Sequence, residues 1–227
     1  MSEKTAALIG ATGLIGGHLL ELLQSDDSFS TIRVLVRRPV PLNHPKIKLL
    51  VIDFTDEAAF KAGIAGCDAV FSTVGTTNKK VNGDKTAYRK VDYDIPVNAA
   101  RNCAETGCRH FLLVSSVGAN SQSGSFYLKL KGEVEVRIRS IGIPSVSIFR
   151  PSMLLGKREE SRPAESVVQT ISKSLSFLFP AQYKPIAAET VAKAMIEACK
   201  QDKPGFHIYH FNEMKAFQEA CKKETHY

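Results

Sequence analysis

The sequence predicts an α/β fold, with a doubly wound parallel sheet covered by helices on both faces. Two features of the 227-residue chain lead to this prediction. Short apolar segments rich in Val, Ile, Leu and Phe alternate with segments of helical composition, as in parallel sheets that helices cover on both sides. The first apolar segment also runs directly into the glycine-rich stretch GATGLIG, residues 10–16. We therefore expect a Rossmann-type sheet of about seven parallel strands.

The predicted elements follow from these alternating segments. Seven strands are expected because their segments are short and almost continuously apolar: residues 5–10, 32–36, 47–52, 69–74, 110–116, 146–150 and 206–211. Six helices are expected between them: residues 14–24, 56–62, 86–106, 126–141, 164–178 and 189–201. No linker or repeat divides the chain, so we predict one domain over residues 1–227. Its small substrate-binding part is expected to be built from about residues 150–190.

Composition narrows the classes of partner. The net charge is +7, but the basic residues are spread along the chain without the interleaved aromatic residues that stack on bases, so we expect no nucleic-acid partner. The stretch TAALIGATGLIGGHLLELL is broken by glycines and lacks the basic start of a signal peptide, so we expect no membrane association. The five cysteines have no metal-ligand spacing, and Cys103 and Cys108 are expected to pack on a helix. These features predict a cytoplasmic protein without a metal site.

The end of the first strand is the strongest indication of a ligand. Gly10 permits a tight turn, Gly13 lets the backbone approach a pyrophosphate, and Gly16 lets the helix pack closely on the strand. The amides of Leu14 and Ile15 would then point at the phosphates from the helix N-terminus. The alternative is a glycine-rich turn without a ligand. The position between a strand and an apolar helix favours a dinucleotide.

The end of the second strand bears on the choice of cofactor. Arg37 and Arg38 stand where NAD-selective sites usually place an acidic residue for the ribose 2′-hydroxyl. Two guanidinium groups suit a 2′-phosphate instead. The alternative is a pair of surface arginines at a strand end. We predict NADP(H) as the cofactor.

The third and fourth strand ends offer further contacts. Asp53 is placed to accept a hydrogen bond from the adenine amino group, with Phe54 beside the ring. Its alternative role is that of a loop acid before a helix capped by Thr55. After the fourth strand, Gly75 lets a cofactor pass close to the backbone and Thr76 offers a hydroxyl, although a simple turn explains both residues equally well.

The stretch SFYLKLKGEVEVRI, residues 125–138, alternates polar and apolar residues like a strand. A strand covering residues 125–141 would be on the order of 55 Å long, well beyond the usual length. As a helix, the segment instead has one apolar stripe, formed by Phe126, Leu130, Val134, Ile138 and Ile141. Tyr127 and Lys131 then lie one turn apart at the edge of this stripe. Leu128 and Val136 lie on the other side, where a subunit contact would explain them.

These motifs resemble the short-chain dehydrogenase/reductase superfamily, through GATGLIG, LLVSS at residues 112–116 and Y-x-x-x-K at residues 127–131. The stretches VGTT, YLKLKGEVE and FRPSMLLGKREESRP are similar to the atypical branch that contains the Tat-interacting oxidoreductase-like protein and its bacterial NAD(P)-binding relatives. The resemblance extends from about residue 5 to residue 200.

The resemblance implies a catalytic set of Ser116, Tyr127 and Lys131. Tyr127 would be the general acid/base, Lys131 its partner and Ser116 the hydroxyl that orients the substrate. A free tyrosine has a pKa near 10, and a nearby ammonium group favours its phenolate, which suits proton transfer at neutral pH. The alternative is an ordinary pair at a helix edge. The resemblance also places Pro151 and Met153 against the nicotinamide, and Ser115 beside the cofactor.

The complete predicted cofactor-binding set is Gly10, Thr12, Gly13, Leu14, Ile15, Gly16, Arg37, Arg38, Asp53, Phe54, Val74, Gly75, Thr76, Ser115, Tyr127, Lys131, Pro151 and Met153. Arg158 and Arg162 lie in a charged stretch that is either a solvated loop or a contact to an anionic substrate.

The expected function is that of an NADP(H)-dependent oxidoreductase acting on a small carbonyl or alcohol. One alternative is a redox-sensing regulatory protein that binds NADP(H) and a protein partner with little or no turnover. A second is an enzyme similar to nucleotide-sugar epimerases, although only 77 residues follow Arg150 to form a substrate region. We expect a monomer or a homodimer.

Overall fold

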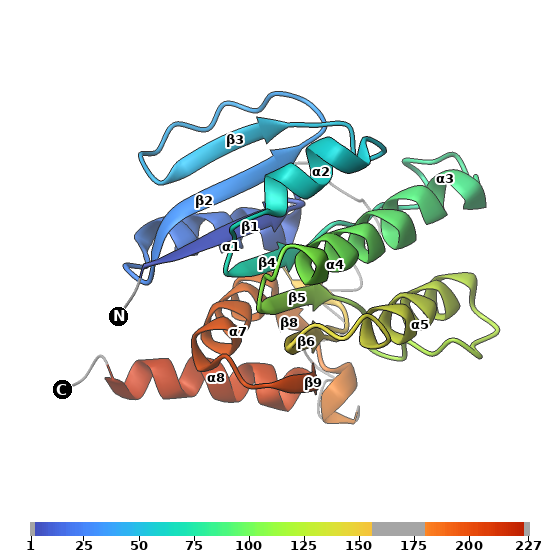
Figure 1. The fold of residues 1–227 in the computed structure, drawn as a ribbon. Coiled ribbons are helices and arrows are strands. Elements are labelled where there is room, and N and C mark those ends of the chain that lie inside the picture. The colour runs from blue at the N-terminus through green and yellow to red at the C-terminus, as the bar shows by residue number, and fades with distance from the viewer. Residues whose placement is uncertain (1–2, 156–179, 225–227) are drawn as a thin grey trace.

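The sheet of the computed structural model, which describes residues 3–155 and 180–224, has seven strands that all run parallel (Figure 1). The strands are β1 (Lys4–Ile9), β2 (Phe29–Val36), β3 (Ile47–Val51), β4 (Ala69–Ser72), β5 (His110–Val114), β6 (Ser145–Phe149) and β9 (Gly205–Tyr209). Their order across the sheet is β3-β2-β1-β4-β5-β6-β9. The predicted seven-stranded Rossmann-type sheet is therefore confirmed.

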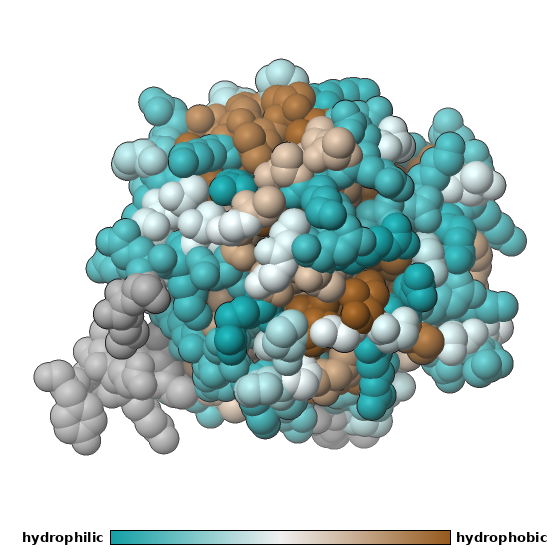
Figure 2. All heavy atoms as spheres, viewed as in Figure 1, coloured by the Kyte–Doolittle hydropathy of each residue, from teal (hydrophilic) through white to brown (hydrophobic). Residues whose placement is uncertain are grey.

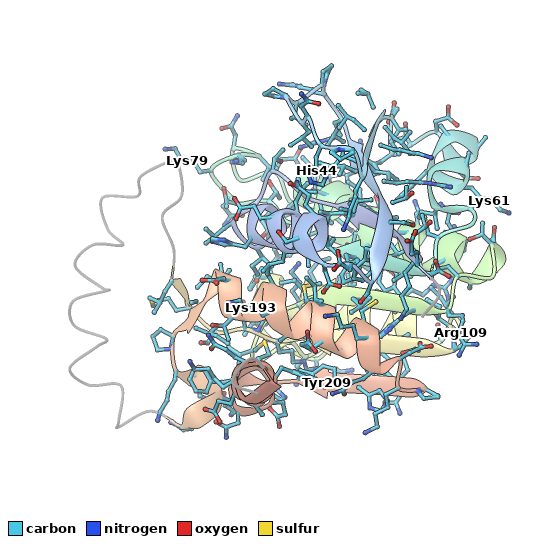
Figure 3. All side chains as sticks on the ribbon, turned by 90° about the vertical axis from the view of Figure 1, so that its left-hand side faces the viewer. His44, Lys61, Lys79, Arg109, Lys193 and Tyr209 are labelled. Carbon is cyan, nitrogen blue, oxygen red and sulfur yellow. The ribbon has the colours of Figure 1, made fainter. Side chains whose placement is uncertain are left out.

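Helices cover both faces of this sheet. The helices α1 (Leu14–Ser25), α7 (Ala188–Gln201) and α8 (Phe211–Glu224) form one layer, and α1 and α7 lie side by side in Figure 3. The helices α2 (Glu57–Ile64), α4 (Ile95–Glu105) and α5 (Phe126–Arg139) form the other layer. The buried residues of β1 show the division, because Ala6 and Leu8 belong to the core under α1 and α7, whereas Ala7 and Ile9 belong to the core under α2 and α4.

The helix predicted over residues 86–106 is in fact three consecutive segments. The short helix α3 (Lys85–Arg89) leads into a π-helical turn, η1 (Lys90–Asp94), and then into α4. A π-helical turn accommodates an additional residue within a helix and therefore changes which side chains face inward. Here it buries the carboxylate of Asp92, whose exposed fraction is 1%. The periodicity of the sequence did not predict this turn.

Other boundaries also differ from the predictions. The helix α5 ends at Arg139, so Ile141 follows the helix and completes the core from the next turn. Cys103 lies on α4, but Cys108 lies in the turn before β5, and both thiols are buried and free. A two-stranded ribbon of β7 (Leu154–Leu155) and β8 (Ile186–Ala187), the 3₁₀ turn η3 (Ala181–Tyr183) and helix α8 were not predicted. The helix expected over residues 164–178 falls outside the described residues.

The strand order places two loops together at the centre of one sheet edge. Strand β1 pairs with β2 on one side and with β4 on the other. The connection after β1 therefore leads toward one edge of the sheet, and the connection after β4 leads toward the opposite edge. The backbone N–H of Thr73 donates to the carbonyl of Ile9 (2.9 Å), and the Thr73 hydroxyl lies 3.1 Å from the carbonyl of Gly10. Sheets of this type bind ligands at such a reversal, outside the carboxyl ends of the strands.

The figures locate the two ends of the strands and an apolar area at one edge of the sheet. In Figure 3, Lys79 in the loop after β4 and Arg109 just before β5 lie on opposite sides of the molecule, so they indicate the carboxyl and amino ends of the strands. Figure 2 shows an apolar area over the edge strand β3, where the side chain of Val51 is exposed. Among the described residues, no helix is both long enough and apolar enough to cross a bilayer.

The first turns of α5 pack directly on the backbone of the loop that precedes the helix. A Cβ atom at Gly132 would lie 2.2 Å from the nitrogen of Ser121 and 2.3 Å from the carbonyl carbon of Asn120. The nitrogen of Asn120 also donates to the carbonyl of Leu128 (3.1 Å), and the Leu128 side chain lies against Gly118. Leu128 is thus explained by packing on this loop, whereas Val136 remains exposed.

We predict that Gly132→Ala lowers the free energy of unfolding by about 2 kcal/mol or more, because the added methyl overlaps backbone atoms of Asn120 and Ser121, and the loop must shift away from the helix to make room. The matched control is Gly17→Ala on α1, where the nearest atom would be 3.8 Å away. That change is expected to be neutral or to stabilise by about 0.5–1 kcal/mol through helix propensity. Chemical denaturation of both variants measures the difference, and equal stabilities would contradict the close packing.

Candidate active site

The turn after β1 has the geometry of an anion-binding loop. Gly10 has a φ of +92°, and its carbonyl accepts the N–H of Gly13 (2.9 Å). A Cβ atom at Gly16 would lie 2.0 Å from the carbonyl oxygen of Gly10, so only glycine fits there. Helix α1 begins after Gly13 with no side-chain cap and no acidic residue in its first turn. The backbone N–H groups of this turn, at Leu14 among others, are therefore left for an anion, such as the pyrophosphate of a dinucleotide.

Arg37 and Arg38 follow β2 at the same end of the sheet, since β1 and β2 run parallel with Ile9 opposite Leu35. Both side chains are exposed, and neither forms a hydrogen bond or ion pair with another described residue. Thr12, in the turn after β1, is exposed as well. The guanidinium groups are thus available to an anionic ligand at this edge.

Asp53 and Phe54, which follow β3, have partners that the sequence did not indicate. The carboxylate of Asp53 accepts the N–H (2.9 Å) and the hydroxyl (2.8 Å) of Thr55, and these bonds hold the pKa of Asp53 below its usual value. The residue that caps α2 is Asp56, not Thr55, because the Asp56 carboxylate accepts the N–H of Ala59. Phe54 packs edge-to-face on Phe60, with ring centroids 4.9 Å apart. Phe54 also lines a groove of about 330 Å³ between α2 and α4.

The loop after β4 is tied to the predicted catalytic lysine by a buried carboxylate. The ammonium of Lys131 lies 2.9 Å from Oδ1 of Asp92, and Oδ2 of Asp92 accepts the N–H of Thr76 (2.7 Å). Side-chain exposure is 7% for Lys131 and 1% for Asp92, so this ion pair is shielded from water. Gly75 leaves space beside the same carboxylate, since its Cβ would lie 3.6 Å from Oδ1. Val74, just before Gly75, is half-buried and packs against the core under α4.

Two tyrosines lie near this ion pair, and their surroundings differ. Tyr88 is buried, and its hydroxyl donates to the carbonyl of Thr76 (3.3 Å). Burial is the main cause that raises the pKa of Tyr88 well above its ordinary value, and the nearby groups of Asp92 and Tyr127 add to it. Tyr127, in the first turn of α5, is 39% exposed. Of the two phenols, only that of Tyr127 is open to a substrate.

The two serines after β5 have different partners. The hydroxyl of Ser115 is buried and donates to Oε1 of Glu135 on α5 (2.5 Å). The hydroxyl of Ser116 is half-buried, and its one contact among the described residues is a long 3.3 Å bond to the carbonyl of Val117. The Ser115 hydroxyl is thus bound within the protein interior, whereas the Ser116 hydroxyl can rotate to donate to a ligand.

Pro151 and Met153 follow β6. The carbonyl of Pro151 accepts the N–H of Val117 (2.9 Å), which joins the loops after β5 and β6. The carbonyl of Met153 accepts the N–H of Ile186 (3.0 Å) from the ribbon, and the Met153 side chain is 45% exposed. Arg158 and Arg162 lie outside the described residues.

Sequence reasoning missed two buried acids at this edge, Asp92 and Glu135. Glu135 follows Lys131 by four residues, the spacing of one helix face, and this was the available signal. For Asp92 the sequence offered no comparable signal, because its orientation depends on the π-helical turn. Both acids pair with a basic residue on a different element, Lys131 in one case and Arg150 in the other.

Comparison with known proteins identifies the family. A family model described as NAD(P)H-binding matches residues 10–202, which include the glycine turn, both ion pairs and the loops after β4, β5 and β6. This chain belongs to that family. Together with the relatives below, the match makes it an atypical short-chain dehydrogenase/reductase and confirms the resemblance to the branch of the Tat-interacting oxidoreductase-like protein.

Two relatives illustrate the similarity. The chain is 36% identical over 205 residues to the mitochondrial protein FMP52 of Debaryomyces hansenii, covering 87% of this chain and 88% of that protein. It is 32% identical over 199 residues to the protein HTATIP2 of Rattus norvegicus, covering 86% of this chain and 81% of that protein.

Solved structures share the fold at low sequence identity. The UDP-N-acetylglucosamine 4-epimerase of Methanobrevibacter ruminantium M1 superposes with a TM-score of 0.71 at 17% identity, covering 96% of this chain and 81% of that one. The enzyme WbmH of Bordetella bronchiseptica, solved in complex with NAD⁺, gives the same TM-score at 19% identity, covering 92% and 76%. These likenesses support the Rossmann-type fold alone.

The prediction of a cytoplasmic location is wrong. The relatives from Debaryomyces hansenii and Candida albicans are both named as mitochondrial proteins, and these names contradict the prediction. The glycine-broken apolar stretch of residues 5–23 and the spacing of the cysteines, on which the prediction depended, do not distinguish the two compartments.

We predict that Asp92→Ala destabilises the protein by about 3–5 kcal/mol, because it leaves the ammonium of Lys131 buried without its partner. The matched control is Asp94→Asn in the same π-helical turn, where the side chain is exposed and the effect should stay within about 0.5 kcal/mol. Denaturant unfolding of both variants makes the comparison. Similar stabilities for the two variants would show that the buried ion pair contributes nothing.

Proposed function

We propose that this protein is an NADP(H)-dependent oxidoreductase that interconverts a small carbonyl compound and its alcohol, with Ser116, Tyr127 and Lys131 as the acid/base set. The observation that supports this most is the pairing on α5: an open phenol at Tyr127 stands one turn from a buried ammonium at Lys131. Both lie at the sheet edge where the glycine turn is built to accept a dinucleotide. The likeness to the rat protein HTATIP2 and the NAD(P)H-binding family are consistent with this function.

In this proposal, the cofactor supplies a hydride to the carbonyl carbon or removes one from the alcohol. During reduction, the Tyr127 hydroxyl gives its proton to the carbonyl oxygen, and the ammonium of Lys131 stabilises the phenolate that remains. The hydroxyl of Ser116 donates a hydrogen bond to the same oxygen as negative charge develops there. The phenolate then recovers a proton from water, and in the alcohol oxidation each step runs in reverse.

The preference for NADP(H) is proposed from the end of β2. Arg37 and Arg38 are both exposed and unpaired among the described residues, and no carboxylate follows β2 directly. Guanidinium groups bind phosphate oxygens in a bidentate manner, which favours the 2′-phosphate over a free 2′-hydroxyl.

One observation favours a second candidate, an NADP(H)-binding regulatory protein. The ammonium of Lys131 is already paired with Asp92, and this pairing competes with the stabilisation of a phenolate at Tyr127. A protein that only senses the cofactor has no need for an unpaired lysine. The likeness to epimerases, by contrast, is one of fold alone, and so gives no support to an epimerase activity.

We predict that NADPH binds at least about tenfold more tightly than NADH and that Arg37→Ala removes most of this difference, because it removes one bidentate phosphate contact. Arg109→Ala is the matched control, since it removes an exposed guanidinium just before β5, at the amino end of the strands and opposite the proposed site (Figure 3). Calorimetric titration with each cofactor gives the affinities. Equal binding of NADPH and NADH to the unaltered protein would refute the 2′-phosphate assignment.

We predict that a screen of small carbonyl compounds finds a substrate for which NADPH is consumed, and that Tyr127→Phe lowers kcat by at least about 100-fold through loss of the proton donor. Tyr93→Phe is the control, because the Tyr93 ring packs under the guanidinium of Arg89. Unchanged turnover in Tyr127→Phe would reject the catalytic assignment. Tight binding of NADPH without its oxidation by any compound would instead support the regulatory protein.

A further inference from the structure

The carboxylate of Glu135 is the centre of a second buried ion pair on α5. Its side chain is 6% exposed, and it lies on the inner side of the helix, one turn after Lys131. Oε1 accepts the hydroxyl of Ser115 (2.5 Å) and the Nε–H of Arg150 (3.0 Å), and Oε2 accepts the Nη2–H of Arg150 (2.5 Å). This carboxylate therefore joins α5 to the ends of both β5 and β6.

Each partner of Glu135 is adjacent to a residue of the proposed active site. Ser115 precedes Ser116, Arg150 precedes Pro151, and Glu135 follows Lys131 by one turn of the same helix. Backbone hydrogen bonds fix the chain at the same points. The N–H of Ser115 donates to the carbonyl of Phe149 (2.7 Å), and the N–H of Arg150 donates to the carbonyl of Tyr209 (2.9 Å). A displacement of Glu135 would therefore move the helix that carries Tyr127 relative to the strand ends.

The chemistry of the contact suits orientation better than stability. A bidentate guanidinium–carboxylate pair fixes distance and angle together, because both groups are planar. The gain in stability from such a pair is small or absent, since two apolar side chains of similar volume often stabilise a protein as well or better. The half-exposed pair between Glu133 and Arg89 (2.7 Å), two residues earlier on α5, lacks these links to the strand ends.

We propose that Glu135 is a positioning residue, which uses its contacts with Arg150 and Ser115 to hold Tyr127 and Lys131 of α5 in register with Ser116 and Pro151 at the strand ends. This inference rests on the proposed function. It adds a residue to that site which touches neither the cofactor nor the substrate and acts through α5.

The test compares Glu135→Gln with Glu133→Gln in NADPH-dependent turnover. Glu135→Gln should lower kcat by about 20- to 100-fold while the dissociation constant for NADPH stays within about threefold, since misplacement by about 1 Å costs this much in rate. Glu133→Gln should stay within about twofold in both quantities, because exposed pairs contribute little. Equal kcat values for the two variants would overturn the proposal.

A double variant, Glu135→Met with Arg150→Met, separates positioning from stability. Replacing both charges should restore the unfolding midpoint to near that of the unaltered protein, but kcat should remain low because the planar pair is gone. Recovery of kcat together with stability would show that the pair serves folding alone. If both Glu135→Gln and the double variant fail to fold, Ser115→Ala provides the test, because it removes a single hydrogen bond to Glu135. It should lower kcat by about three- to tenfold. An unchanged kcat would overturn the proposal.

A measurement without substrate keeps this test separate from that of the proposed function. In protein labelled with ¹³C-tyrosine, the resonance of Tyr127 is assigned from its loss in Tyr127→Phe. Glu135→Gln should shift this resonance and Glu133→Gln should not. If the unaltered protein turns over no carbonyl compound, the proposed function fails, and the Tyr127 resonance alone then decides whether Glu135 positions the helix.

Discussion

The need to keep one ammonium group charged inside the protein constrains the whole carboxyl edge of the sheet. Lys131 is 7% exposed, and an unpaired ammonium with so little contact to water would be costly. Asp92 supplies the opposite charge, and the carboxylate in turn needs the N–H of Thr76 to complete its bonding. Because Asp92, Thr76 and Lys131 come from three different elements, this one charge fixes how η1, the loop after β4 and α5 meet.

The glycine turn after β1 imposes a second constraint of a different kind. Gly16 brings α1 so close to the carbonyl of Gly10 that no side chain fits between them, and the hydroxyl of Thr73, the first residue after β4, donates to the same carbonyl. The two central strand ends are thus bound to each other before any ligand arrives. The anion site and the buried lysine are then connected through a few residues of the loop after β4, from Thr73 to Thr76.

Much of this arrangement could be predicted from the sequence, because it depends on local patterns. Continuous apolar segments indicated all seven strands of the parallel sheet, and the glycines indicated the turn. The stretch with alternating residues was correctly assigned as a helix, since its stripe of Leu130, Val134 and Ile138 is fully buried. The roles proposed for Ser116, Tyr127 and Lys131 remain predictions that the geometry permits.

The parts that could not be predicted depend on long-range contacts between charges. From the sequence, Asp92 is expected to be an exposed acid on a helix. The π-helical turn instead orients its side chain inward, and the periodicity of the sequence does not indicate that turn. The hydrogen bond between Ser115 and Glu135 joins residues 20 positions apart, and the expected place of Ser115 beside the cofactor stays a prediction. Helix α8 was missed because its apolar residues, such as Met214 and Phe217, are few and pack on partners that are distant in the pattern, on α7, η3 and β9.

The π-helical turn η1 also affects which changes in chain length this region tolerates. Helix α3 is held by Tyr88, whose ring packs edge-to-face on Phe126 of α5, while α4 is held by the sheet through residues such as Ala99 and Cys103. In a helix each residue turns the following face by about 100°. A deletion of one residue within η1 would restore a regular α-helix. It would also either rotate Tyr88 away from α5 or rotate α4 away from the sheet. Insertions and deletions between residues 85 and 105 should therefore be far rarer among related sequences than in the exposed loops that flank them.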